Sequence, residues 1–506
     1  MSASELAAEI KAALDVDREA FEARVDAEAE ALREEVDDGT FDNPQAIVGL
    51  EYEFYAVDDE TDALMRVPRR LLEYIGFEKE LGLHNAELST TPQPLSRYGL
   101  RAQEAEVQAK LDAAETEVVR EGMALVSDGL WTVPPVGETA SEYLTDSIEK
   151  EGIRMATNMS RAVRYHAMAN TDYAAELQLE APHVSLSADT VMPESLITSI
   201  QPHYQVAHAG DLPETFRYAL RIAGPLLAVS VNSPFFPPDL YEVDGETVIE
   251  ECWMENRVPV FESVLNPADS KKVTFPEDID SVEEAIDRIA ADATVVPADL
   301  DPEGRFDDDF AHFRHTHGSF WRWVRPVFGG STRTNANARI EFRPLPGQPT
   351  VRGTIALLAV FSGLLESLPR REHPVFDQPR ETAEGNFYRA VEDGLEAELA
   401  WVTADGTETT DTEEIYAELF ELARDGLQLR GLDAAEANRY IQPLRERVDR
   451  RMTPARWKHD RVKARMADGE PFGQAIWGMQ ADYIDAQSET LIEGSFLEWL
   501  ESAPHR

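Results

Sequence analysis

The sequence predicts a fold of the α+β class. Several short segments alternate strictly between apolar and polar residues, which is the period of a β-strand with one buried face. Longer segments before, between and after them carry apolar residues at helical spacing. Because 43% of the 506 residues are hydrophobic, the chain can bury a large core, and we expect a folded protein.

The strand-like segments each present ionisable groups on their polar face. These segments and groups are 46–57 (AIVGLEYEFYAV) with Glu51 and Glu53, 85–90 (NAELST) with Glu87, 181–188 (APHVSLSA) with His183, and 335–345 (NANARIEFRPL) with Glu341 and Arg343. Carboxylates gathered on one sheet face repel one another, but divalent cations bound by their oxygens reverse the sign of that interaction. The repetition of this pattern therefore predicts a metal site, whereas any one segment alone is typical of a solvated strand face.

Arginines beside prolines or aromatic residues suggest a second kind of ligand. Arg257 lies in ENRVPVF, Arg325 in WRWVRPVF and Arg343 in IEFRPLP. A guanidinium donates two parallel hydrogen bonds and suits a phosphate or a carboxylate. The alternative for each arginine is a structural salt bridge. Metal, phosphate and carboxylate together favour the ATP-dependent activation of an acid.

Helical segments account for most of the remaining chain. We expect an acidic helix over 3–37 ending at Asp38-Gly39, a loop over 131–137, and helices over 97–127, 142–168, 213–231, 351–368 and, with few breaks, from about 385 onward. Residues 266–310 are acidic and rich in loops, with a short helix near 281–291, and we interpret them as an insertion or lid. Since the polar motifs span 49–343, we expect residues 1–40 to form an N-terminal helix and 41–506 a single catalytic domain.

Acidic residues dominate the composition and are spread along the whole chain. The formal net charge is −49, from 96 acidic and 47 basic residues. We interpret this as adaptation to high salt, which screens the repulsion; the alternative is an ordinary acidic cytosolic protein. The charge argues against nucleic-acid binding. No secretory signal or membrane-spanning apolar run is evident, and we expect a cytoplasmic protein.

Two local features have simple structural explanations. The single cysteine, Cys252, excludes an intramolecular disulfide, and we favour a buried small apolar residue over a nucleophile. Residues 443–465 are locally basic, and we favour a surface that pairs with the chain's own carboxylates over a ligand patch.

The ordered set of motifs resembles the second family of glutamate–cysteine ligases and related carboxylate–amine ligases of the glutamine-synthetase-like superfamily. The resemblance covers about residues 46–470 and rests on GLEYEF, NAELSTTPQPL, PHVSLS, GPLLAVSVNSPFF, ENRVPVF, FWRWVRPVF, ARIEFRPLPGQPT and NFYRAVEDGLEAEL. The family's histidine strand often reads H-V-H, whereas this chain has His183-Val184-Ser185. Only His183 is therefore carried over from that motif.

The resemblance implies a curved antiparallel sheet around a funnel-like site, with helices outside. It implies that ATP phosphorylates the γ-carboxylate of glutamate and that an amine, most simply that of cysteine, displaces phosphate. Mg²⁺, or alternatively Mn²⁺, would be bound by Glu51, Glu53, Glu87, His183 and Glu341. Arg343 would contact the transferring phosphate, and Arg257 and Arg325 the ATP phosphates or the α-carboxylate of glutamate. Partners would be small molecules, with a homo-oligomer left open.

Three alternatives remain at this point. The acceptor amine could differ from cysteine, because no acceptor pocket is evident in the sequence. A catalytically inactive relative could bind nucleotide or amino acid as a regulatory subunit, although that role does not need a set of metal-binding carboxylates. A metal-dependent hydrolase is disfavoured by the arginines.

Overall fold

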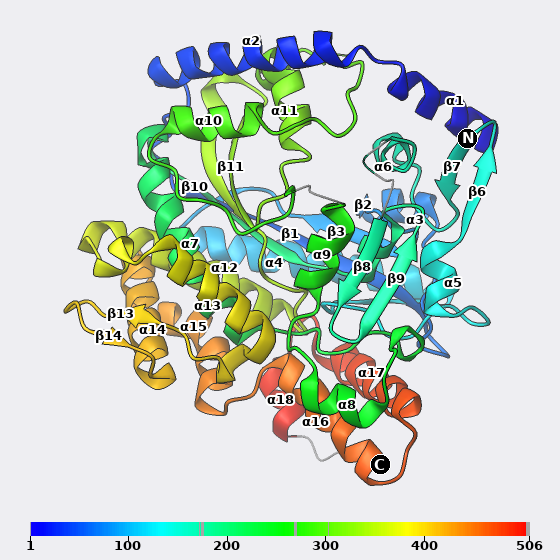
Figure 1. The fold of residues 1–506 in the computed structure, drawn as a ribbon. Coiled ribbons are helices and arrows are strands. Elements are labelled where there is room, and N and C mark those ends of the chain that lie inside the picture. The colour runs from blue at the N-terminus through cyan, green and yellow to red at the C-terminus, as the bar shows by residue number, and fades with distance from the viewer. Residues whose placement is uncertain (1, 172, 174–176, 268–270, 302, 502–506) are drawn as a thin grey trace.

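An antiparallel sheet that curls into a half-barrel forms the centre of the molecule (Figure 1). Six strands run in the order β11 (Val324–Gly329), β12 (Asn337–Phe342), β10 (Ile200–Gln205), β1 (Ile47–Asp58), β3 (Asn85–Ser89) and β2 (Glu78–Lys79). The short strands β4 (Gln93–Pro94) and β5 (Met123–Val126) also pair with β1. The computed structural model describes residues 2–171, 173, 177–267, 271–301 and 303–501. The α+β class and the curved antiparallel sheet are thus confirmed.

Helices cover the apolar face of this sheet. Val48, Leu50, Tyr52 and Phe54 of β1 are buried on that face. They pack with α4 (Arg97–Val118), α7 (Leu212–Ser230) and α12 (Val351–Ser367) in one core. Helix α12 has the length and hydropathy of a membrane span over 351–371, but 94% of its most apolar window is buried inside the protein. Its hydropathy therefore reflects a core position.

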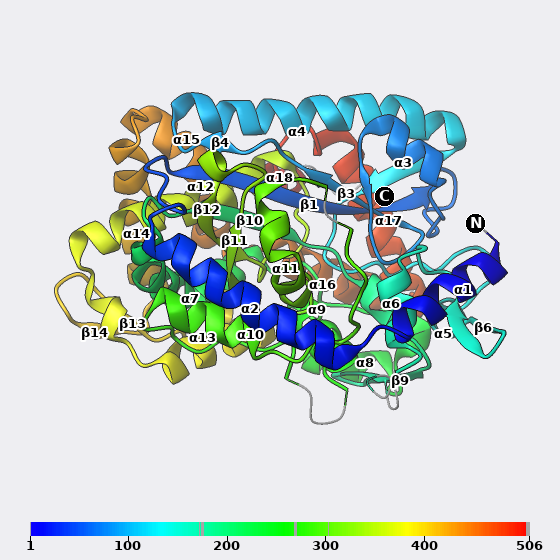
Figure 2. The ribbon, with the colours of Figure 1, turned by 90° about the horizontal axis from the view of Figure 1, so that it is seen from above.

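The remaining helices form an outer layer and a C-terminal bundle (Figures 1 and 2). Their bounds are α3 Arg69–Ile75, α5 Ala140–Thr145, α6 Val163–Met168, α8 Gly245–Glu251, α9 Arg257–Leu265, α10 Val282–Ala290, α11 Ala311–His317, α13 Arg380–Asp393, α14 Thr412–Leu429, α15 Ala434–Asp449, α16 Pro454–Ala467, α17 Phe472–Thr490 and α18 Phe496–Glu501. Three hairpins stand apart from the main sheet: β6 (Ser147–Lys150) with β7 (Ile153–Ala156), β8 (Leu177–Ala181) with β9 (Val184–Ala188), and β13 (Trp401–Val402) with β14 (Glu408–Thr409). Parts of the ranges 1–40, 266–310 and 385–506, namely residues 1, 268–270, 302 and 502–506, lie outside the described residues.

Three predicted helices are interrupted or shortened in the structure. The segment 97–127 is helical as α4 only to Val118, and after Gly122, whose φ is 71°, it continues as strand β5. The segment 3–37 forms α1 (Ala3–Leu14) and α2 (Arg18–Asp37), because Asp17 leaves the helix and its side chain caps Ala20 N. The segment 142–168 is helical only at its ends. Its centre is the β6–β7 hairpin, whose turn places Glu151 and Gly152 at φ of 55° and 78°. Two consecutive left-handed residues are typical of a tight hairpin turn, with which no helix is compatible.

The N-terminal helix α2 lies along α10 and α11 (Figure 2). Glu28 of α2 accepts hydrogen bonds from the backbone N–H groups of His312 and Phe313, at 2.7 and 2.9 Å. It also lies 2.6 Å from His312 Nδ1. These contacts tie the start of the chain to the first turn of α11, which borders the polar face of the sheet.

Candidate active site

The strand register places the predicted carboxylates on one face of the sheet. Glu53 of β1 lies directly opposite Glu87 of β3. On the other side of β1, Glu341 of β12 lies between His203 of β10 and Arg325 of β11. These four sequence-predicted residues, Glu53, Glu87, Glu341 and Arg325, therefore share one face of the sheet with His203, which the sequence analysis did not select.

His203, and not His183, is the imidazole of this face. His203 Nε2 lies 3.2 Å from Glu51 Oε1, and Arg339 Nε donates to His203 Nδ1 at 3.3 Å. The predicted placement of His183 on the same sheet is wrong. His183 lies in the β8–β9 turn with φ of 62°, and its Nε2 is 3.0 Å from Glu251 of α8. An alternating strand pattern does not specify the sheet to which a strand belongs, and β9 pairs only with β8 among the named strands.

Glu341 is the centre of an ion-pair cluster. Its Oε1 lies 2.9 Å from Arg325 Nη2 and 2.8 Å from Arg343 Nη1, and its side chain is 5% exposed. Burial opposes ionisation, but the two guanidinium groups outweigh it and hold the pKa of Glu341 well below its usual range. Arg343 Nη1 also donates to Gln201 Oε1 at 3.0 Å. The cluster therefore holds both guanidinium groups over the polar face.

A second group of carboxylates has the opposite electrostatic character. Burial and the nearby charge of Glu80 raise the pKa of Glu53 to about 7 and the pKa of Glu194 to about 8. The same two causes, with a hydrogen bond to Glu80, raise the pKa of Glu87 well above its usual range. Glu53 accepts hydrogen bonds from Ser199 N, Ser199 Oγ and Gln201 Nε2 at 2.6, 3.0 and 2.9 Å. Glu80 lies in an irregular segment and Glu194 in a single short 3₁₀ helix, Met192–Leu196, so neither belongs to a periodic pattern and sequence reasoning missed both.

Arg257 supports the site by hydrogen bonds to the backbone that follows β12. Its side chain is buried, and its Nη2 donates to Arg343 O at 3.0 Å and to Pro344 O. Its guanidinium lies over the Trp323 ring, 5.3 Å from the centroid. In this arrangement its terminal nitrogens fix the backbone that carries Arg343, and its direct contact with a ligand stays a prediction.

A cavity of about 540 Å³ opens beside the first cluster. The sheet contributes Glu51, His203 and Glu341 to its floor. Its walls carry four arginines and an acidic residue, namely Arg305, Arg314, Arg325, Arg339 and Asp307. Arg305, Asp307 and Arg314 belong to the segment held by α2, so part of the predicted insertion forms a wall of the site. The volume and the cationic walls fit a polyanionic small molecule.

The side chains at this site suit a divalent cation by their chemistry, but they are not already arranged around a single metal position. No group of three or more histidine, cysteine, aspartate or glutamate residues has metal-binding geometry in the part of the chain that the structure describes. However, burial and, after it, the charges of neighbouring carboxylates raise the pKa values of Glu53, Glu87 and Glu194. A cation would remove this penalty, and carboxylate oxygens with one imidazole suit Mg²⁺ or Mn²⁺.

The curled sheet carries carboxylates and guanidinium groups on one face, and the family to which the sequence belongs identifies the protein as a ligase. The sequence model of glutamate–cysteine ligase family 2 matches residues 47–487, and the chain belongs to this family. The resemblance drawn from the ordered motifs is thereby confirmed, and the protein is a carboxylate–amine ligase.

The solved structures that align with this chain include other ligases. The glutamate–cysteine ligase of Francisella tularensis, in complex with AMP, aligns with a TM-score of 0.53 and 11% identity, over 91% of this chain and 92% of that chain. The bifunctional glutathione synthetase of Pasteurella multocida aligns with a TM-score of 0.45 and 14% identity, over 91% of this chain and 55% of that chain. No curated protein sequence matches the chain.

Proposed function

We propose that the protein joins the γ-carboxylate of glutamate to the amine of cysteine at the expense of ATP, through a γ-glutamyl phosphate. The observation that carries this proposal is the juxtaposition of Glu341 with Arg325 and Arg343 beside a row of crowded carboxylates. A nucleotide-dependent ligase must hold a polyphosphate and two carboxylate-bearing substrates in one place. The family membership and the AMP complex of the Francisella tularensis enzyme support the choice of ATP.

The metal-binding residues in this proposal are Glu51, Glu53, Glu87, His203 and Glu341, with Glu80 as an added carboxylate. His203 replaces His183 because it lies 3.2 Å from Glu51, while His183 lies on a separate hairpin. When bound, Mg²⁺ or Mn²⁺ would neutralise phosphate charge and polarise the phosphoryl oxygens.

The arginines of the chain act on the transferring phosphate. Arg343 and Arg325 are held by one carboxylate, so their guanidinium planes need little reorganisation when charge shifts during transfer. The carboxylate oxygen of glutamate attacks the γ-phosphorus of ATP, and ADP leaves. Phosphate is a far better leaving group than oxide, so the acyl carbon then becomes susceptible to an amine.

The amine attacks the acyl carbon, a carbon–nitrogen bond forms, and phosphate leaves while the nitrogen loses a proton. No protein nucleophile is needed. We further propose that residues 41–506 act as one catalytic unit, since the site draws on β1, β3, β10, β11 and β12 together with residues 305–317.

The test is phosphate release in concentrated KCl with ATP, MgCl₂ and glutamate, with each amino acid supplied in turn as acceptor. We expect release only with cysteine, together with the dipeptide product. Glu87→Gln should abolish release, whereas Glu408→Gln, which alters an exposed carboxylate of β14, should leave it unchanged. Release with another amine would assign a different acceptor, and release without glutamate or acceptor would contradict the ligase proposal.

A further inference from the structure

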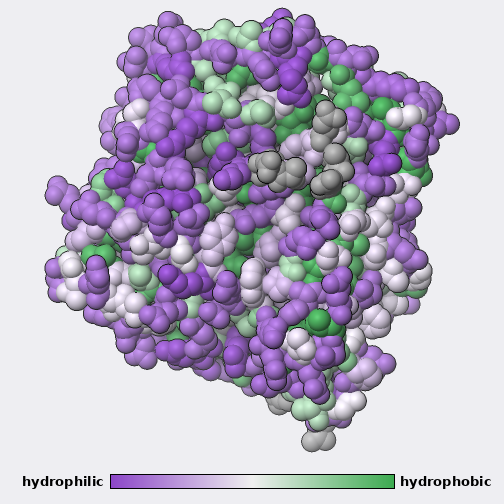
Figure 3. Space-filling model, viewed as in Figure 1, coloured by the Kyte–Doolittle hydropathy of each residue, from purple (hydrophilic) through white to green (hydrophobic). Residues whose placement is uncertain are grey.

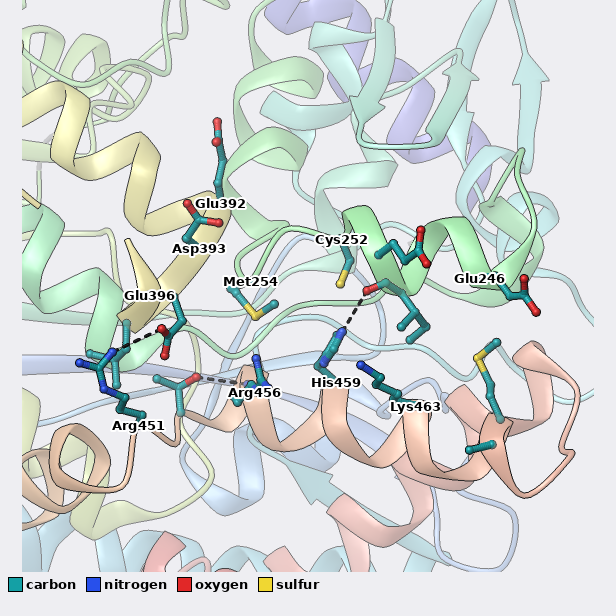
Figure 4. Close-up of a pocket in the computed structure, with 16 residues that line it drawn as sticks. Glu246, Cys252, Met254, Glu392, Asp393, Glu396, Arg451, Arg456, His459 and Lys463 are labelled. Atoms are coloured by element: carbon teal, nitrogen blue, oxygen red, sulfur yellow. Dashed lines mark hydrogen bonds and ion pairs between the residues drawn. The ribbon is translucent and has the colours of Figure 1, made fainter. Parts of the chain in front are cut away.

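A second cavity, of about 660 Å³, lies away from the sheet (Figure 4). It is bordered by α8 and the loop after it, by the end of α13, and by α16, near the bottom of Figure 1. None of its lining residues lines the cavity beside Glu341. Its size is that of sites that hold small organic molecules. Two features with no role in the catalytic proposal, Cys252 and the basic stretch 443–465, meet here.

One wall of this cavity is cationic. Arg456, His459 and Lys463 follow one another at intervals of three and four residues, so they share one face of α16. Hydrogen bonds to Asp460 and Cys252 raise the pKa of the His459 ring to about 10, so the ring carries a positive charge at neutral pH. Within the described part of the chain, Lys463 forms no ion pair. The rest of the basic stretch largely pairs with the chain's own carboxylates, as expected.

The opposite wall is anionic. Glu250 comes from α8, and Glu392 and Asp393 come from the end of α13. None of these three carboxylates forms an ion pair among the described residues. The two walls meet at one end of the cavity, where Arg451 lies 3.3 Å from Glu396, and also where His459 Nε2 lies 3.0 Å from Ile249 O of α8. Arg456 and His459 both pair with Asp460, at 3.0 and 3.3 Å, so among the described residues Lys463 and these three carboxylates border the cavity as unpaired charges.

Cys252 lies between these walls. The sequence analysis favoured a buried residue, but Cys252 is only half-buried. Its sulfur points toward His459 (Figure 4). It is also the single cysteine of the chain, so a thiol reagent reports on this cavity alone.

We propose that this cavity binds a small zwitterion of the short-peptide class. The carboxylate of the ligand contacts Lys463, and its ammonium contacts Glu392 and Asp393. A ligand with separated opposite charges satisfies both walls at once, whereas an anion or a cation alone leaves one wall unmatched. The proposal is independent of the catalytic proposal, because the two cavities share no residue.

The test measures the rate at which neutral iodoacetamide alkylates Cys252 in 1 M KCl, with triglycine as the probe. Two matched peptides serve as ligand controls: N-acetyl-triglycine lacks the ammonium group, and triglycine amide lacks the carboxylate. We expect triglycine to slow alkylation and each control to require about tenfold higher concentration for the same protection, because each loses one charged contact. Equal protection by all three peptides would overturn the proposal.

Variants separate specific binding from general effects. Lys463→Gln and Glu392→Gln should each weaken protection by triglycine about tenfold. Arg461→Gln should leave protection unchanged, because Arg461 lies on α16 but faces Asp482 at 3.5 Å and does not line the cavity. Calorimetric titration of triglycine into the wild type and the three variants measures binding directly, so it also detects a ligand that binds without shielding the thiol. No heat with the wild type, or equal heat with all four proteins, would also overturn the proposal.

Discussion

Arg343 Nη1 lies 2.8 Å from Glu341 Oε1. Glu341 is in β12, and Arg343, two residues further along the chain, directly follows the end of that strand. Side chains two residues apart project to the same face of a strand, so this contact fixes the guanidinium above the sheet. Arg325 approaches the same oxygen from β11 at 2.9 Å. The arrangement positions two cations at the point where we place the transferring phosphate.

We predict that Arg343→Lys lowers the rate of γ-glutamyl phosphate formation by at least about tenfold, or about 1.4 kcal/mol of barrier. Lysine keeps the charge but cannot donate two parallel hydrogen bonds to a phosphate. ATP affinity should change much less, since the contact matters most in the transition state. Single-turnover kinetics and equilibrium ATP binding measure the two effects. A lower melting temperature with an unchanged rate would assign Arg343 a purely structural role.

We predict that Glu53→Gln abolishes turnover and yet stabilises the protein at pH 8 without divalent cations. Glutamine has the shape of the protonated acid, and the pKa of Glu53 is raised to about 7 by burial and by Glu80. At pH 8 the wild-type side chain carries a costly charge that glutamine lacks. Activity assays and thermal melts test both parts. Normal turnover, or a lower melting temperature at pH 8, would contradict the assignment.

The stability of the metal-free protein should fall as pH rises from about 7 to about 8, a range in which the buried histidines, whose pKa values are lowered in the folded state, are largely neutral in the unfolded state as well. Glu53 and Glu194 keep their protons to about pH 7 and 8 in the folded protein, whereas a free glutamate ionises near pH 4.3. In this window the folded state binds more protons than the unfolded state, so the slope of unfolding free energy with pH is negative. Each pKa unit of difference contributes up to about 1.4 kcal/mol. MgCl₂ should flatten the slope, and an identical slope with and without MgCl₂ would argue against a cation at these carboxylates.

The sequence was sufficient for strands β1, β3 and β12 of the main sheet and for most of the carboxylate row. The alternation in β1, β3 and β12 identified Glu51, Glu53, Glu87 and Glu341, because one face of each strand is buried against helices. The helices α7, α10 and α12 lie within one or two residues of their predicted ranges. Apolar periodicity is reliable where an element is long and has one buried face.

The histidine could not be chosen correctly from periodicity. Both β9 and β10 alternate, with His183 before one and His203 inside the other. Pro202 interrupts β10 and argues against a central strand, because proline lacks the N–H that a neighbouring strand needs. The structure nevertheless pairs β10 with β1 and β12. Glu80 and Glu194 reach the site through tertiary packing, for which a single sequence has no local signal.

We predict that the protein requires concentrated salt for stability. The net charge is −49, and hydrophilic residues cover most of the face visible in Figure 3. Raising KCl from about 0.1 to about 1 M shortens the Debye length from about 10 to about 3 Å and weakens repulsion between surface carboxylates. The melting temperature should therefore rise with KCl. Sucrose, which strengthens burial without screening charge, is the control. Equal melting temperatures at the two KCl concentrations would contradict the prediction.

Isotope transfer tests the central claim most directly. Glutamate labelled with oxygen-18 in its γ-carboxylate is incubated with the enzyme, ATP, MgCl₂ and cysteine, and the released phosphate is analysed by mass spectrometry. If the carboxylate attacks the γ-phosphorus, one labelled oxygen remains bonded to phosphorus when the amine displaces phosphate. We therefore predict one oxygen-18 atom in each phosphate and one fewer in the dipeptide than in glutamate. Phosphate that carries no label, with its new oxygen drawn from water, would contradict the acyl-phosphate mechanism.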